Sequence, residues 1–185
     1  MKFSNRENSS YLIELPKGGE KTVWESRSVA VNLVVLITPT RDLSDTRVLV
    51  AQRGPKAADY QGFYNLVAGY LDWDENGTEA AVRECWEETG LNLIDLTWAE
   101  GIQIISNNLN QPWHVKTDPS SNRQNVSHRY GLKILSQRDF PFLNTDNNEV
   151  VGEVENPHWM KIDDIPNHQW AFDHDQVIFD YLSRR

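Results

Sequence analysis

The sequence predicts a single α/β domain, on the strength of two observations. Segments rich in β-branched residues recur along the chain between turn-like residues, and two other segments have the pattern of helices. No repeat, low-complexity tract or linker divides the 185 residues. We therefore expect one domain over residues 1–185, with an irregular, polar N-terminal segment over residues 1–26.

The expected strands follow one another along the chain and are short. Residues 11–15 are a strand-like segment within the polar N-terminal stretch. The other expected strands span residues 29–37, 47–52, 63–67, 98–105 and 126–135. A strand-like HWMKI segment precedes a last helix, which we expect from Asp173 to Leu182. Residues 106–124 form a long polar stretch, and a stretch of that length in a compact domain is usually functional or mobile.

The segment GYLDWDENGTEAAVRECWEETGL, residues 69–91, carries the strongest signal in the chain. Asn76, followed three residues later by Glu79, is typical of a capping box at the start of a helix. Gly90 fits the left-handed position that ends one. A helix is therefore predicted between them, and its core-facing side is expected to hold Ala81, Val82, Cys85 and Thr89.

Three carboxylates share one face of this helix. At about 100° per residue, Glu84, Glu87 and Glu88 fall within about 100° of arc. Like charges this close repel one another, so a compensating cation is expected beside them. Mg²⁺ is the natural candidate because it takes oxygen ligands, and no cluster of cysteines and histidines indicates zinc. Arg83 lies four residues before Glu87, where it can orient a carboxylate.

The alternative to a metal site is that the three glutamates form the solvated face of an amphipathic helix. Gly69 and Glu75, at fixed spacings upstream, are residues that such a face does not need. They favour the metal site.

At every specified position the segment resembles the signature box of the Nudix hydrolases. This resemblance implies an α/β/α sandwich with a central mixed β-sheet, which binds Mg²⁺ or Mn²⁺ and hydrolyses a nucleoside diphosphate linked to another moiety. It also implies roles for single residues. Glu84, Glu87, Glu88 and the carbonyl of Gly69 are similar to the metal ligands, and Glu75 and Arg83 are similar to the supporting residues.

The resemblance leaves the general base open, because members take it either from the box or from a distant loop. Within the box, Glu84 and Glu87 are the catalytic candidates. In the later acidic segment over residues 144–166, Glu153 is favoured by its position relative to Trp159. Its neighbours Glu149 and Glu155 are alternatives, and so is a solvated acidic loop without a catalytic role.

Substrate preference rests on weaker similarities. Residues 110–113 partly resemble the core motif of the NADH-cleaving branch, whose other features are missing. The segments over residues 117–127 and 170–178 look like stretches of ADP-ribose pyrophosphatase-like members. We expect hydrolysis of ADP-ribose or a related ADP-linked metabolite. A house-cleaning nucleoside triphosphate pyrophosphohydrolase and a non-catalytic sensor of ADP-ribose-like ligands are the alternatives.

Aromatic and cationic residues outside the box are candidates for binding the substrate. The aromatic candidates can stack on a base, although a core or rim position is the alternative for each, and the arginines can contact phosphate with two hydrogen bonds. The candidates are Arg53, Tyr64, Trp113 and Arg123, with Phe63 and Arg129 as further choices.

Composition narrows the class of partner and the compartment. A net charge of -9 argues against nonspecific binding to nucleic acid. The single cysteine, Cys85, excludes a disulfide framework within the chain and is expected to be buried. The longest apolar run is too short to span a bilayer, and the N-terminus lacks the apolar region of a signal peptide. We expect a cytoplasmic protein with a nucleotide-type small-molecule substrate, no membrane partner, and a homodimer left open.

Overall fold

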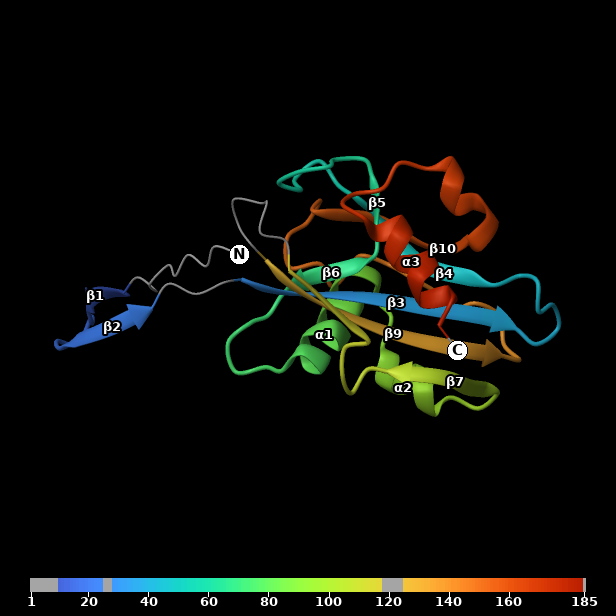
Figure 1. Cartoon of the computed structure of the whole chain (residues 1–185), viewed down its shortest axis with the longest axis horizontal. Coiled ribbons are helices and arrows are strands. Elements are labelled where there is room, and N and C mark those ends of the chain that lie inside the picture. Colours follow the sequence, from blue (N-terminus) through green and yellow to red (C-terminus); the bar gives the residue numbers. More distant parts are fainter. Residues whose placement is uncertain (1–9, 25–27, 118–124, 185) are drawn as a thin grey trace, which may run out of the picture.

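The computed structural model describes residues 10–24, 28–117 and 125–184. Its centre is an eight-stranded sheet whose main strand order is β10-β4-β3-β9-β7 (Figure 1). These strands span Val154–Lys161, Arg47–Arg53, Val29–Pro39, Val126–Ser136 and Ile102–Asn108, respectively. Strand β3 pairs with β9 in parallel and with β4 in antiparallel orientation. The predicted mixed sheet is confirmed.

Three short strands complete the sheet. Strand β5 (Tyr64–Asn65) pairs with β4, and β6 (Val67–Tyr70) pairs with β3. Together they replace the single strand expected over residues 63–67. Strand β8 (His114–Thr117) pairs with β9, so part of the long polar stretch belongs to the sheet.

Helices cover both faces of the sheet, as the sandwich prediction requires. Helix α1 (Gly77–Thr89) and helix α3 (His174–Leu182) lie on opposite faces (Figure 1). Alternate residues of β3 point to the two sides, because side chains alternate along a strand. Val35 packs in the cluster that includes α1 residues, and Val34 packs in the cluster that includes α3 residues.

The predicted strand over residues 98–105 is wrong at its start. Trp98 ends helix α2 (Leu93–Trp98), and strand β7 begins only at Ile102. The side chain of Asn92 accepts hydrogen bonds from the first turn of α2 and so caps it. Leu93 and Leu96, three residues apart, are both buried, which is the spacing of one helix face. A 3-10 helix, η1 (Ile162–Asn167), lies between β10 and α3.

The described part of the N-terminal segment contains the strand expected near residues 11–15 and is otherwise more regular than expected. Strands β1 (Ser10–Glu14) and β2 (Glu20–Trp24) form a separate antiparallel sheet of two strands. Figure 1 draws this hairpin apart from the main sheet. Its apolar side chains Leu12 and Ile13 are exposed. Among the described residues, no helix has the length and apolar character needed to cross a membrane.

Candidate active site

Helix α1 begins and ends where the sequence predicts. The Asn76 side chain accepts the backbone N–H groups of Thr78 and Glu79 at 3.0 and 3.1 Å, and the Glu79 carboxylate accepts the Asn76 N–H at 2.8 Å. This is a complete capping box. Gly90 has the left-handed φ of 70° that ends the helix. Local signals therefore fix the helix that carries the glutamates.

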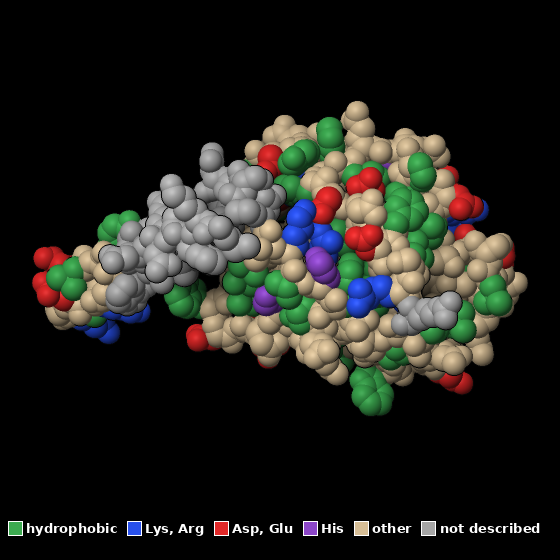
Figure 2. All heavy atoms as spheres, in the orientation of Figure 1, with side chains coloured by type: hydrophobic (Ala, Val, Ile, Leu, Met, Phe, Trp, Pro, Cys, Tyr) green, Lys and Arg blue, Asp and Glu red, His purple; other side chains and the backbone are tan. Residues whose placement is uncertain are grey.

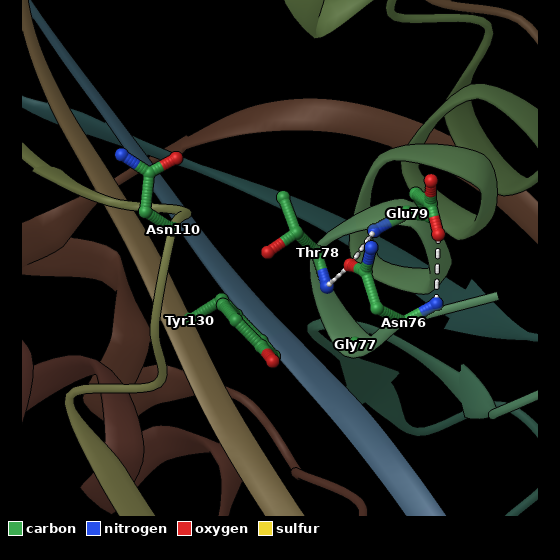
Figure 3. A pocket seen from close by; sticks show the side chains of 6 residues that line it. All are labelled: Asn76, Gly77, Thr78, Glu79, Asn110 and Tyr130. Atoms are coloured by element: carbon green, nitrogen blue, oxygen red, sulfur yellow. Dashed lines mark hydrogen bonds between the residues drawn. The ribbon is translucent and has the colours of Figure 1, made fainter.

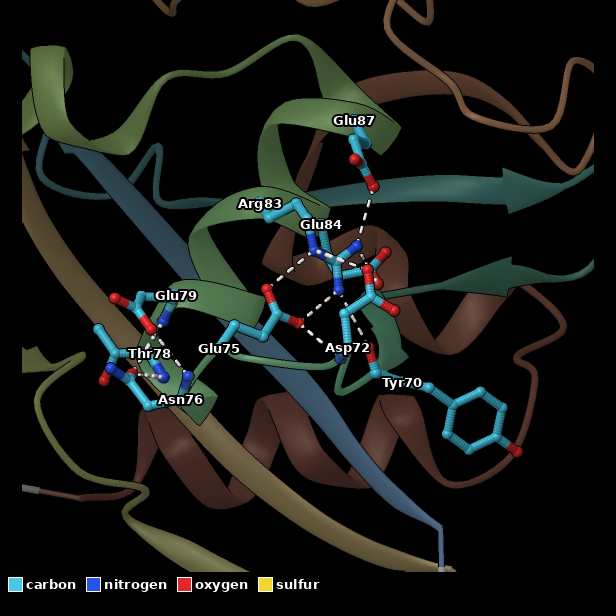
Figure 4. Close-up of polar contacts among 9 residues, drawn as sticks. All are labelled: Tyr70, Asp72, Glu75, Asn76, Thr78, Glu79, Arg83, Glu84 and Glu87. Atoms are coloured by element: carbon cyan, nitrogen blue, oxygen red, sulfur yellow. Dashed lines mark hydrogen bonds and ion pairs between the residues drawn. The ribbon is translucent and has the colours of Figure 1, made fainter. Parts of the chain in front are cut away.

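Arg83 is the centre of the acidic cluster (Figure 4). Its Nε and Nη2 atoms donate to Glu75 at 3.0 and 2.8 Å, and Nη1 donates to Glu84 at 2.9 Å and to Glu87 at 3.0 Å. Nη2 also donates to the carbonyl of Tyr70 at 3.0 Å. The rigid fork of one guanidinium thus orients three carboxylates and the end of β6.

Glu75 joins the loop after β6 to the helix. Its Oε1 atom also accepts the backbone N–H of Asp72 at 2.8 Å. The hydrogen bond from Arg83 lowers the pKa of Glu75, so this carboxylate stays ionised. The loop is therefore held by a charged pair, in addition to the packing of Leu71 against the core.

Glu88 is buried and Glu84 is half-buried. Glu88 is 7% exposed, and its carboxylate accepts the backbone N–H of Ala68 at 3.2 Å. Burial raises the pKa of Glu84 to about 7, against the opposing charge of Arg83. Burial, followed by the charge of Glu84, raises the pKa of Glu88 well above its usual range. Two carboxylates that are at least half-buried at this point favour a cation beside them.

Gly69 lies directly against this cluster. Strand β6 places it opposite Val31 of β3, and a Cβ on Gly69 would fall 1.9 Å from Oε1 of Glu84. Any side chain here would displace the carboxylate. A glycine in the middle of a strand is thus explained by the close approach of the glutamate.

The sequence profile of the NUDIX domain family matches residues 27–181, which is most of the chain. The chain belongs to the NUDIX domain family. A search among curated proteins found no match.

Solved Nudix structures share this fold. The NUDIX domain of Shewanella oneidensis NrtR complexed with ADP ribose is 17% identical, with a TM-score of 0.57, and the match covers 86% of this chain and 89% of that one. A bifunctional NMN adenylyltransferase/ADP ribose pyrophosphatase from Francisella tularensis, complexed with AMP and Mn ion, is 23% identical with a TM-score of 0.59. That match covers 85% of this chain and 41% of the other.

A C. elegans Ap4A hydrolase in a binary complex is 15% identical, with a TM-score of 0.56, and the match covers 84% of this chain and 96% of that one. At these identities the likeness establishes the fold.

The oxygen donors of the Nudix box fit a hard divalent cation. The box offers the carboxylates of Glu84, Glu87 and Glu88 beside the backbone of Gly69, all of them oxygen ligands of the kind that Mg²⁺ and Mn²⁺ prefer. Arg83 bonds to two of these carboxylates. Within the described ranges, no group of three or more His, Cys, Asp or Glu side chains is arranged closely enough to hold a metal ion.

Glu153 immediately precedes strand β10. Its backbone carbonyl accepts the N–H of Gly54 at 2.7 Å, which ties the loop to the end of β4. The pKa of Glu88 rises through burial first, then through the charge of Glu84, and to a smaller extent through the charge of Glu153. The exposed Glu153 carboxylate therefore lies within electrostatic reach of the box, and its role as a base stays a prediction.

Arg53 is placed near the box but already has partners. Its Nε donates to the carbonyl of Asp59 at 2.8 Å, and Nη2 donates to the Asp59 carboxylate at 2.7 Å. Its guanidinium also lies 5.5 Å from the ring centroid of Phe172. Arg53 therefore holds the loop after β4, and it would have to keep this role while making the predicted contact with phosphate.

Tyr64 and Trp113 pack on the sheet face that carries α3. Both rings lie against the buried cluster of that face. Trp113 donates from Nε1 to the carbonyl of Tyr130 at 3.1 Å, and its ring centroid is 5.4 Å from that of Tyr181. Both aromatics are thus half-buried at the edge of this core. Arg123 lies outside the described residues.

A polar cluster lies on the same side of the sheet, around the start of α3. Asp173 accepts hydrogen bonds from Lys116 at 2.8 Å and from the buried Arg129 at 2.6 Å, so Arg129 is committed to an ion pair. Figure 2 shows basic, acidic and histidine side chains gathered near the middle of this face. Next to Asp173, His174 is fully buried, and burial lowers its pKa to about 4.

A cavity of about 500 Å³ lies at the start of α1 (Figure 3). Asn76 already accepts the helix N–H groups that could have bound an anion, and the Glu79 carboxylate adds a negative charge. The cavity is therefore unsuited to a diphosphate. It is lined by Asn76, Gly77, Thr78, Glu79, Asn110 and Tyr130.

Proposed function

We propose that this Nudix protein hydrolyses the diphosphate linkage of a nucleoside diphosphate derivative, with ADP-ribose or a related ADP-linked metabolite as the substrate. The observation that carries the proposal is the Arg83 cluster, in which one guanidinium orients Glu75, Glu84 and Glu87. The buried Glu88 adds a further oxygen donor next to it. Two structures with the same fold support the choice of substrate: one is complexed with ADP ribose, and the other is named as an ADP ribose pyrophosphatase.

Mg²⁺ or Mn²⁺ is the proposed cofactor. Glu84, Glu87, Glu88 and the carbonyl of Gly69 would hold it, and a fold relative carries a Mn ion. A bound divalent ion would neutralise charge that develops on the phosphate oxygens. Glu84 and Glu87 now accept hydrogen bonds from Arg83, so metal binding requires them to share their oxygens between the ion and the guanidinium.

Residues of the protein would orient the reacting groups and accept the proton of the attacking water. Arg83 keeps Glu84 and Glu87 at fixed angles, which lowers the entropic cost of reaching the reacting geometry. Water is the nucleophile, and a carboxylate must take its proton. Glu153, on the loop that approaches Glu88, is our first candidate for this base, with Glu84 as the alternative.

A substrate panel tests the reaction. The purified full chain would be incubated with Mg²⁺ and either ADP-ribose, NADH, diadenosine polyphosphates, nucleotide sugars or nucleoside triphosphates, and the nucleotide products separated by chromatography. Release of AMP from ADP-ribose at the highest kcat/KM is the expected result. Faster cleavage of nucleoside triphosphates would instead favour the house-cleaning role. Tight binding of ADP-ribose without release of AMP would favour the sensor.

A pair of variants separates the two candidate bases. Glu153→Gln and Glu84→Gln would be compared for kcat and for the pH dependence of kcat. Loss of the base should lower kcat by about a hundredfold or more and abolish the acidic limb of the profile. Asp146→Asn, an exposed acidic residue of the same segment to which no role is assigned, is the control. Unchanged kcat in Glu153→Gln would transfer the role to Glu84.

Assembly and location are part of the same proposal. We place the protein in the cytoplasm as a single domain and a homodimer, with no nucleic-acid partner. The exposed Leu12 and Ile13 of the β1–β2 hairpin are apolar surface that a second copy can cover. Light scattering of the full chain and of Leu12→Asp would check this, since the charge should shift a dimer toward monomer. Cell fractionation would check the location.

A further inference from the structure

Two aromatic rings from different loops meet next to Arg53. Tyr60 lies in the loop after β4 and Phe172 in the loop before α3, and their ring centroids are 4.8 Å apart with the planes tilted by 58°. Tyr60 is 44% exposed and Phe172 is 50% exposed. Large rings normally bury most of their surface, so this pair presents apolar area to solvent.

Both residues have an unusual backbone conformation. The φ angle is 51° at Tyr60 and 57° at Phe172, in the left-handed region that side chains disfavour. Such conformations cost energy and persist where the surrounding structure enforces them, often at ligand sites. Here they direct two rings toward each other at the surface.

The loop of Tyr60 is held by its neighbours. Arg53 binds both the carbonyl and the carboxylate of Asp59, the residue before Tyr60. On the other side, the Gln61 side chain donates to the carbonyls of Pro55 and Ala57 at 2.9 and 3.0 Å. Tyr60 is therefore fixed in place before any ligand arrives, which lowers the entropic cost of binding.

The loop of Phe172 is anchored on both sides as well. The N–H of Ala171 donates to the carbonyl of Tyr64 at 2.8 Å. Two residues after Phe172, the buried Nδ1 of His174 accepts the N–H of Leu66 at 3.0 Å. The exposed ring thus sits between two buried anchors.

These anchors join the ring pair to the Nudix box. Leu66 lies two residues before Ala68, whose N–H binds the Glu88 carboxylate, so about 7 Å of extended strand separates the two contacts. Arg53, which pairs with the Asp59 carboxylate, stands over the Phe172 ring, and its charge also acts on Glu88 of the box. Arg53 therefore links the ring pair to the box.

We propose that Tyr60 and Phe172 form the platform on which the aromatic base of the substrate stacks. This proposal rests on the proposed hydrolysis of a nucleoside diphosphate derivative and places the base away from Tyr64 and Trp113, whose rings are half-buried against the core. Stacking on aromatic side chains tolerates different bases, because every base has a π face. The platform thus selects substrates that carry an aromatic base over those that lack one.

Calorimetric binding of AMP and of ribose 5-phosphate, with Mg²⁺ present, tests the platform without turnover. The two probes share a sugar and a phosphate and differ in the base. The wild-type chain should bind AMP about tenfold more tightly than ribose 5-phosphate, which is the gain expected from stacking one base. Phe172→Gly and Tyr60→Leu should lose most of this preference and leave the affinity for ribose 5-phosphate unchanged.

Two features of the variants exclude a purely structural effect. Glycine is relaxed at the φ of position 172, so relief of strain offsets the lost ring contact and Phe172→Gly should melt within a few degrees of the wild type. Phe172→Tyr keeps a ring and should retain the preference for AMP. Trp98→Leu removes an exposed ring at the end of α2 and should also retain it.

The outcomes separate the platform from the catalytic proposal. Equal preference for AMP in the wild type, Phe172→Gly and Tyr60→Leu would overturn the platform even if the wild type cleaves ADP-ribose. Loss of the preference in these variants, in a protein that cleaves no diphosphate, would support the platform and contradict the proposed hydrolysis.

Discussion

Gly69 and Glu84 touch so closely that position 69 has no room for a side chain. A Cβ there would lie 1.9 Å from Oε1 and 2.5 Å from Oε2 of Glu84. The two residues come from strand β6 and helix α1, so their contact joins the sheet to the helix where the oxygen donors gather. The close approach explains why a strand tolerates a glycine at this position.

Gly69→Ala should lower kcat by about a hundredfold, because the new methyl group moves the Glu84 carboxylate by a large fraction of an ångström or more. Steady-state kinetics on ADP-ribose would measure the loss. The double variant Gly69→Ala, Glu84→Asp gives the shorter carboxylate more room, so it should lose less activity than the two single changes combined. Strict additivity would argue against this contact as the cause.

Glu88→Gln should separate activity from folding. Glutamine keeps the shape of the side chain and can still accept the Ala68 N–H, and it removes a carboxyl group whose pKa burial raises. We expect a melting temperature at or above that of the wild type, measured in chelator, with kcat reduced well over tenfold. Glu87→Gln should lose kcat to a similar degree. Near-wild-type turnover in both variants would contradict the metal assignment.

Arg83→Gln should make folding stability more responsive to metal. Loss of the guanidinium removes hydrogen bonds to three carboxylates and should cost about 1–2 kcal/mol without metal. Mg²⁺ can then replace the lost positive charge, so its stabilising effect on the melting temperature should exceed that in the wild type.

Arg47→Gln is the control for this comparison. It removes an ion pair with Asp45, at 2.9 Å, outside the box. Mg²⁺ should shift its melting temperature as much as it shifts that of the wild type. An equal shift in Arg83→Gln would show that the ion and the guanidinium do not compete for the same carboxylates.

Affinity for Mn²⁺ should fall as the pH drops below about 7. Burial raises the pKa of Glu84 to about 7, so below this pH the carboxyl group is protonated in the metal-free protein and must release its proton to bind an ion. The affinity should fall by up to about tenfold per pH unit for each proton released and level off at higher pH. Calorimetry in two buffers of different ionisation enthalpy would count the protons. No proton release at pH 6 would contradict the prediction.

His174 should remain neutral down to about pH 4 in the folded protein. Its folded pKa lies below the ordinary value of 6.5, so the unfolded state binds more protons between these values and becomes favoured as the pH falls. Protonation of His174 in the unfolded state should by itself lower the free energy of unfolding by about 3 kcal/mol between pH 7 and pH 4. Titration of the histidine ring signals by NMR would measure the pKa. A value near 6.5 would refute a buried neutral ring.

The local sequence determined the helix of the Nudix box. Asn76, Glu79 and Gly90 act on backbone groups within a few residues, so their signals can be recognised without the rest of the chain. The spacing also placed Cys85 on the buried side and brought Arg83 and Glu87 together at i,i+4. The cluster of donors was predictable for this reason.

Tertiary structure decided what distant segments contribute. Apolar residues after Leu91 fit either a strand or a helix over a short distance, so only packing settled that α2 precedes β7. Composition could not distinguish aromatic rings half-buried against the core, such as Tyr64 and Trp113, from rings at the surface, such as Tyr60 and Phe172. Tyr60 and Phe172 come together from positions more than a hundred residues apart, a pairing that no local pattern records. Glu88 packs against the backbone of Ala68, twenty residues earlier, and burial raises its pKa.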